Sequence, residues 1–129
     1  VGKRLLRHGA NGLVPLAEAK LRGERVRIDD VADSAKGLML QAHGSDIDTI
    51  VLACTHFPLL EQELREAFGQ GVEFVHGAQG IARRIAHLTE GQPFARSTGD
   101  CAITTGALAD FERLAPAFAE RGIDRLEKF

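Results

Sequence analysis

Apolar residues recur along this chain in two kinds of segment. In five segments they are spaced three or four residues apart, which is the pattern of one buried face of an α-helix; these segments are residues 11–21, 31–42, 57–68, 77–88 and 108–119. Between them lie shorter segments that we expect to be strands, at residues 3–7, 48–53, 72–75, 101–105 and 123–126. The alternation predicts an α/β fold with a mainly parallel sheet flanked by helices.

One strand-to-helix junction carries candidate chemistry. The predicted strand 48–53 ends at Cys54, and Thr55, His56 and a helix-opening proline follow. Ligands of parallel sheets bind beyond the carboxyl ends of the strands. The backbone N–H groups of a helix start can stabilise a thiolate or hold a carboxylate, and a histidine can exchange protons near neutral pH. Cys54 is therefore a candidate reactive thiol, although cysteine is also often buried as a small apolar residue.

Other polar residues favour structural interpretations when they are considered alone. Cys101 lies on a predicted strand, which favours a place in the core. Glu18 stands between alanines on a predicted helix, which is typical of a solvated face. His76 ends a predicted strand and can face a cleft. No C-x-x-C or H-E-x-x-H spacing occurs, so a metal site is not expected.

Composition narrows the class of protein. The 129 residues are 44% hydrophobic and 26% charged, which suits one soluble domain or parts of two. A formal net charge of −2 argues against nucleic acid as a partner. No apolar run is long enough for a membrane span, and no secretory signal opens the chain. Two cysteines make a poor disulfide framework, so we expect a reducing cytoplasm. Met39 is the only methionine and Val1 opens the chain, so we expect a fragment.

Three blocks of sequence resemble the C-terminal half of the glutamate racemases, within the aspartate/glutamate racemase superfamily. Residues 51–60, VLACTHFPLL, resemble the motif of the family's second catalytic cysteine. Residues 13–24, LVPLAEAKLRGE, resemble the segment with an active-site glutamate, and residues 80–85, GIARRI, form a third block. The likeness extends over nearly the whole chain. The family usually has glycine in place of Ala53 and commonly has aspartate in place of His76.

The resemblance implies a two-domain architecture. The family's fold is a pair of pseudo-symmetric α/β domains with the active site between them, and each domain contributes one cysteine. Residues 1–77 would then belong to the second domain, which carries the catalytic cysteine, and residues 78–129 would return to complete the first domain. Residues 77–88 would form the helix that crosses between them. The other cysteine and an aspartate–serine pair would lie in an N-terminal half that this chain lacks.

The resemblance also implies a reaction and the residues that perform it. The family interconverts L- and D-glutamate and supplies D-glutamate for peptidoglycan, which supports cell-wall biogenesis and cell shape. Inversion at Cα without a cofactor needs two acid/base groups on opposite faces, a thiolate and a thiol. Cys54, His56 and Glu18 are the implied catalytic residues, and Thr55 with Cys54 is the implied substrate-binding pair. No metal, pyridoxal phosphate or Schiff-base lysine is required.

Two other interpretations stay open. Another cofactor-independent member of the superfamily, such as an aspartate or hydantoin racemase, also places a cysteine at this strand end. A non-catalytic half-protein would act by binding a partner or would fold only as an oligomer, and a homodimer is an open alternative. We expect the isolated 129 residues to be inactive, because they carry only one of the two cysteines.

Overall fold

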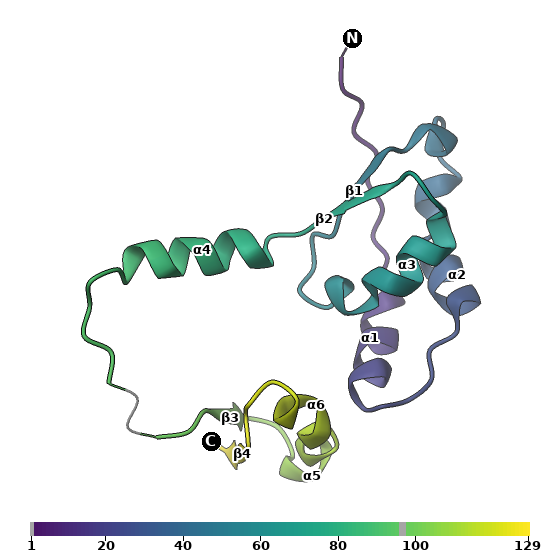
Figure 1. Cartoon of the computed structure of the whole chain (residues 1–129). Coiled ribbons are helices and arrows are strands. Elements are labelled where there is room, and N and C mark those ends of the chain that lie inside the picture. The colour runs from purple at the N-terminus through teal and green to yellow at the C-terminus, as the bar shows by residue number, and fades with distance from the viewer. Residues whose placement is uncertain (1, 96–97) are drawn as a thin grey trace.

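The computed structural model describes residues 2–95 and 98–129, in which short strands alternate with helices (Figure 1). The helices are α1 (Leu13–Leu21), α2 (Ile28–Met39), α3 (Glu61–Phe68), α4 (Ala78–Leu88), α5 (Leu108–Glu112) and α6 (Ala115–Ala119). Two short 3-10 helices are η1 (Gly44–Asp46) and η2 (Phe57–Leu60). The strands are β1 (Thr49–Val51), β2 (Glu73–Val75), β3 (Cys101–Thr104) and β4 (Arg125–Lys128).

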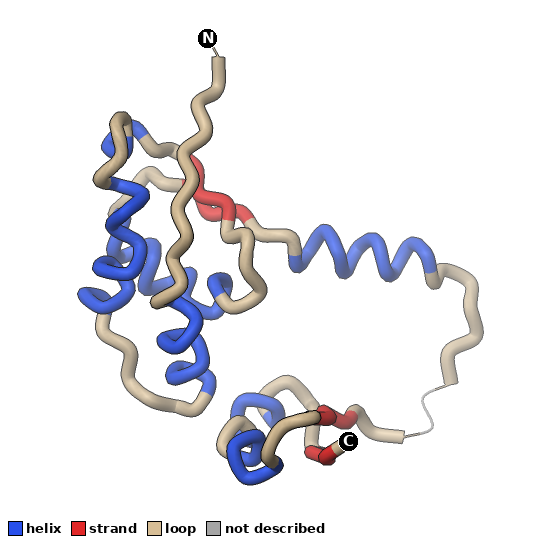
Figure 2. The backbone as a smooth tube through the Cα atoms, turned by 180° about the vertical axis from the view of Figure 1, so that it is seen from behind, coloured by secondary structure: helices blue, strands red, loops and turns tan. Residues whose placement is uncertain are grey.

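The strands form two parallel pairs. β1 pairs with β2, with Ile50 opposite Phe74, and β3 pairs with β4, with Ala102 opposite Leu126. Figure 2 shows the two pairs at separate places, with α4 between them along the chain. The predicted α/β class with parallel strands is confirmed. Within the described residues, however, the sheet is divided into two pairs instead of being continuous.

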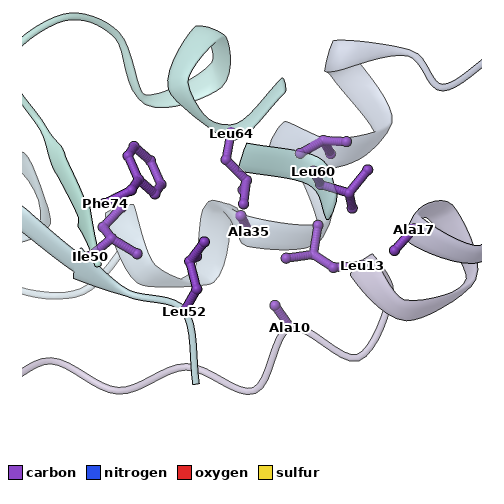
Figure 3. Close-up of a cluster of buried hydrophobic side chains, with 10 residues drawn as sticks. Ala10, Leu13, Ala17, Ala35, Ile50, Leu52, Leu60, Leu64 and Phe74 are labelled. Carbon is purple, nitrogen blue, oxygen red and sulfur yellow. The ribbon is translucent and has the colours of Figure 1, made fainter. Parts of the chain in front are cut away.

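The apolar core lies around the first strand pair. Its ten buried residues come from α1, α2, η2, α3, both strands and the adjoining turns: Ala10, Leu13, Ala17, Val31, Ala35, Ile50, Leu52, Leu60, Leu64 and Phe74. In Figure 3 nine of these side chains are labelled, and they converge from the helices and strands onto one cluster. Leu60, which ends η2, is fully buried. It therefore anchors the turn that follows Cys54 to the core.

Shortening a core side chain should destabilise this small cluster strongly. Leu64 is 2% exposed, and Leu64→Ala should lower the free energy of unfolding by about 3 kcal/mol, because it removes buried methyl groups and leaves a cavity. Leu40 is 78% exposed, so Leu40→Ala is the matched control and should change the free energy by less than about 0.5 kcal/mol. Urea unfolding followed by circular dichroism measures both. Equal effects would contradict the assignment of the core.

Several predicted elements differ from the observed ones. The predicted strand 3–7 is wrong: the segment has no strand structure, and the Arg7 carbonyl accepts a hydrogen bond from Gln41 Nε2 at 2.9 Å. The predicted helix 108–119 is divided into α5 and α6, because Pro116 has no N–H to continue the helix. The predicted helix 57–68 begins as η2 and becomes α-helical only at Glu61. The predicted helix after Cys54 thus opens with a single 3-10 turn.

The start of α2 also differs from the prediction. The apolar pattern predicts a helix from residue 31, but α2 begins at Ile28, so the carboxylates of Asp29 and Asp30 lie in its first turn. There they still oppose the positive end of the helix dipole favourably. The predicted helix 11–21 begins only at Leu13, after Gly12, and has no side-chain cap bond.

The α4 helix has an apolar stripe that nothing in the described residues covers. The sequence predicts Ile81, Ile85 and Leu88 along one face, and these side chains are 57–62% exposed. No residue of α4 is buried. Figure 1 shows α4 projecting from the first strand pair, after which the chain returns so that α5 and α6 lie next to α1. The position of α4 is therefore set by its connections and not by packing.

Candidate functional site

Cys54 lies just beyond the carboxyl end of β1. The Leu52 N–H donates to the Val75 carbonyl at 2.8 Å, so the pairing with β2 continues one residue past the strand. The Phe57 N–H then donates to the Cys54 carbonyl at 3.2 Å and closes the turn that opens η2. Because β1 and β2 are parallel, their carboxyl ends share one edge of the sheet. Cys54 occupies the position at which parallel sheets bind ligands.

The imidazole of His56 lies next to the thiol of Cys54. Cys54 Sγ and His56 Nδ1 are 3.9 Å apart, and the contact is partly buried. This separation is within the range of a weak hydrogen bond to sulfur. An imidazole at this position can receive the proton of a thiol and return it. The pair has the composition of a thiol activated by an adjacent base.

The carboxylate of Glu18 lies on the other side of the same imidazole. His56 Nε2 and Glu18 Oε1 are 3.6 Å apart, and the Glu18 side chain is 50% exposed. α1 explains this placement: Leu13 and Ala17 face the core, and Glu18, the next residue around the helix, faces the turn. The three groups form a series of thiol, imidazole and carboxylate. A carboxylate behind an imidazole orients the ring and stabilises its protonated form.

A cavity of about 390 Å³ opens beside the His56–Glu18 pair. One wall is formed by Glu18, Leu21, Arg22 and His56. The opposite wall comes from residues 104–114, including Thr104, Asp110 and Phe111. Thr104, which ends β3, and Asp110 on α5 are not among the residues predicted from the sequence, because they approach the first wall only through the tertiary fold. Cys54 and Thr55 are not part of the cavity wall in the described structure.

The remaining candidates lie apart from this series. Thr55 is exposed on the turn between Cys54 and His56. Cys101 begins β3, and both cysteines are free thiols of intermediate exposure. Cys101 Sγ donates to the adjacent Ala102 carbonyl at 3.6 Å. The expected location of Cys101 on a strand is confirmed, but the expected place in the core is wrong, because Cys101 is not among the buried core residues.

Arg22 adds a fixed positive charge to the cavity wall. Its Nε donates to Glu24 Oε1 at 2.6 Å. This hydrogen bond is the main cause that lowers the pKa of the Glu24 carboxyl, and the charge of the guanidinium adds to it. The Arg22–Glu24 pair is thus ionised at neutral pH.

His76 occupies the corresponding position at the end of β2. Its Nδ1 accepts a hydrogen bond from the Ala78 N–H at 3.3 Å. Its Nε2 lies 3.7 Å from Glu61 Oε2 on α3. The imidazole therefore contacts the first residue of α4 and the first residue of α3 at the same time.

The described part of the chain has neither a metal-ligand cluster nor a membrane-spanning helix. Residues 2–95 and 98–129 contain no group of three or more His, Cys, Asp or Glu side chains that could hold a metal ion. None of the helices among them combines the length and the apolar character needed to cross a membrane.

Comparison with known proteins finds relatives among the glutamate racemases. No family model matches the chain. A glutamate racemase of Sphingopyxis alaskensis is 59% identical over 91 residues, which are 70% of this chain and 34% of that protein. A glutamate racemase of Klebsiella pneumoniae is 38% identical over 122 residues, which are 93% of this chain and 42% of that protein.

The structural comparison agrees with these relatives. The crystal structure of Escherichia coli glutamate racemase, in complex with L-glutamate and the activator UDP-MurNAc-Ala, superposes with a TM-score of 0.80 and 34% sequence identity. The match covers 91% of this chain and 44% of that chain. The resemblance predicted from the sequence motifs is confirmed. The chain matches these relatives over most of its own length, but it spans less than half of their length.

Proposed function

We propose that this chain, a homologue of the glutamate racemases along most of its length, supplies one acid/base half of an enzyme that interconverts L- and D-glutamate. The observation that carries the proposal is the series of Cys54, His56 and Glu18, with contacts of 3.9 Å and 3.6 Å, at the carboxyl edge of β1. The E. coli relative of known structure was crystallised with L-glutamate. That ligand supports glutamate as the substrate.

The proposed chemistry is a proton transfer on each face of the substrate. In one direction the Cys54 thiolate accepts the proton of the substrate Cα, and a thiol on the opposite face donates a proton to the resulting carbanion. In the reverse direction the roles are exchanged, so Cys54 begins as the thiol. His56 exchanges the thiol proton, and Glu18 stabilises His56 in its protonated form. Thr55 holds a substrate carboxylate. No cofactor or metal takes part in this scheme.

The second thiol is assigned to the part of the enzyme that this chain does not cover. The matched relatives are more than twice as long as the region in common, which leaves room for a domain with the opposing cysteine. We assign residues 1–77 to the domain of Cys54 and residues 78–129 to the completion of the other domain. The core supports this division, because its buried residues run only from Ala10 to Phe74. D-glutamate would be supplied to peptidoglycan synthesis in the cytoplasm.

The test of the proposed function is the fate of the α-hydrogen. The complete protein, without added pyridoxal phosphate, is incubated with L-glutamate in D₂O. We expect D-glutamate that carries deuterium at Cα, because the proton delivered to the second face comes from a thiol that exchanges with solvent. L-aspartate and a hydantoin serve as competing substrates. Absence of D-glutamate, or faster conversion of either competitor, would overturn the assignment.

Replacing Glu18 should slow the reaction without stopping it. Glu18→Gln keeps the size of the side chain but removes the charge behind His56, and we expect kcat to fall about tenfold, a fraction of what a direct acid/base group contributes. Glu66→Gln on the exposed side of α3 removes an equal charge elsewhere and should leave kcat unchanged. Steady-state kinetics with both enantiomers measure this. An unchanged kcat in Glu18→Gln would remove Glu18 from the site.

A further inference from the structure

The chain passes from one wall of the cavity to the other by way of the junction between β2 and α4. Glu18 and His56 precede this junction, whereas Thr104 and Asp110 follow it. α4 begins two residues after His76, and none of its side chains is buried. Since packing does not hold α4, the groups at its first turn must fix the direction in which it leaves the sheet.

His76 is the side chain that contacts both sides of this junction. Its Nδ1 accepts from the Ala78 N–H, one of the N–H groups that a helix start leaves without a backbone partner. Because Nδ1 is the acceptor, the ring proton resides on Nε2. Nε2 points toward Glu61 on α3, and Arg65 holds Glu61 through contacts of 2.7 Å and 3.0 Å. The side chains of His76 and Glu61 are 24% and 28% exposed, so this network is partly shielded from water.

We propose that His76 is a positioning residue that ties the start of α4 to α3 and so sets the separation of the two cavity walls. The inference rests on the proposed function for its effect on catalysis, but not for its effect on structure. When the contact between His76 and Glu61 is lost, a smaller fraction of the molecules has the two cavity walls at the separation that binds substrate. The apparent KM rises by the inverse of that fraction, whereas kcat at saturation is unchanged.

Substitution of His76 by asparagine tests the two contacts of the imidazole independently. Asn Oδ1 and His Nδ1 are the same number of bonds from Cα, so His76→Asn can still accept from the Ala78 N–H. The shorter side chain cannot reach Glu61. Glu61→Gln removes the other partner of the same contact. If both substitutions act through the His76–Glu61 contact, the double variant should be no worse than either single variant.

Kinetics and amide hydrogen exchange of the complete protein test this proposal. We expect His76→Asn, Glu61→Gln and the double variant each to raise the KM for glutamate about threefold, as expected for the loss of one weak, partly exposed contact between an imidazole and a carboxylate, with kcat within about twofold. Exchange at Ala78 should stay slow in His76→Asn and become about fivefold faster in His76→Ala, which loses the acceptor of the Ala78 N–H. Additive changes in KM, an unchanged KM, or a fall in kcat would overturn the proposal.

A second histidine–glutamate pair is the matched control. His87 Nδ1 and Glu90 Oε2 are 4.0 Å apart at the other end of α4, and both side chains are well exposed. His87→Asn and Glu90→Gln should change neither KM nor exchange.

A distance measurement separates this proposal from the proposed function. Spin labels attached by non-cysteine chemistry at Gln62 and Glu112, both exposed, report the separation of α3 and α5. We expect a broader distance distribution in His76→Asn than in the unsubstituted protein, whether or not the protein racemises glutamate. Identical distributions would overturn the positioning role even in an active racemase. An inactive protein with the broadened distribution would overturn only the proposed function.

Discussion

Cys54→Ala should abolish racemisation by the complete enzyme while the fold is retained. Cys54 is the thiol that we assign to one face of the substrate, and an alanine cannot accept or donate the α-proton. We expect kcat to fall by about a thousandfold in both directions, which is within the range of a direct acid/base group. Cys54 is not among the buried core residues, so the unfolding midpoint should change little. Kinetics with each enantiomer and urea unfolding test the two halves of this expectation.

Cys101→Ala provides the matched control. Cys101 is also a free thiol of intermediate exposure, but it lies on β3, and its sulfur donates to the adjacent Ala102 carbonyl. We expect its kcat to stay within about twofold of the unsubstituted enzyme, since surface-type changes away from the site have small effects. More than a few per cent of the activity remaining in Cys54→Ala would reject Cys54 as the base. A loss of activity in Cys101→Ala would give that thiol a role beyond packing.

The part of the site that could be predicted from sequence is local. Cys54, Thr55 and His56 follow a strand of apolar residues and precede a proline, so the strand, the turn and the start of the helix are all encoded within a short stretch. The structure places Cys54 just beyond the carboxyl end of β1, which ends at Val51, two residues earlier than the predicted strand. Glu18 could not be found this way, because a carboxylate on α1 shows no local sign of its partner. Only the resemblance pointed to it.

The features that could not be predicted depend on tertiary contacts. Thr104 and Asp110 enter the cavity wall because α5 and α6 return beside α1, and no periodicity in their own segment encodes that return. The strand expected at residues 3–7 needs a neighbouring strand to pair with, which a local pattern cannot supply. The apolar stripe of α4 was predicted correctly as a pattern. Its exposure was not, because amphipathicity indicates a face to be covered without identifying what covers it.

The 129 residues by themselves should show no racemase activity and should associate in solution. They contain one thiol at the proposed site, and a single acid/base group would return the proton to the face from which it came. They also expose Ile81, Ile85 and Leu88 on α4 and Ile103 on β3, with exposed fractions of 57–62%. Exposed apolar surface of this kind favours association. We expect activity below about one per cent of the complete enzyme, whose acid/base pair would be intact.

The same surface offers a test of what normally covers it. Sedimentation velocity should show association of the isolated chain that rises with concentration, and Ile81→Lys with Ile85→Lys should suppress it, because the charges prevent apolar contact. Ala82→Lys and Arg84→Ala, also on α4, change charge outside this stripe and serve as controls. Adding the proposed N-terminal half as a separate polypeptide should restore racemisation and remove the self-association together, since we assign both effects to that half. Racemisation by the 129 residues alone, at a rate near that of the complete enzyme, would defeat the assignment of the second thiol to that half.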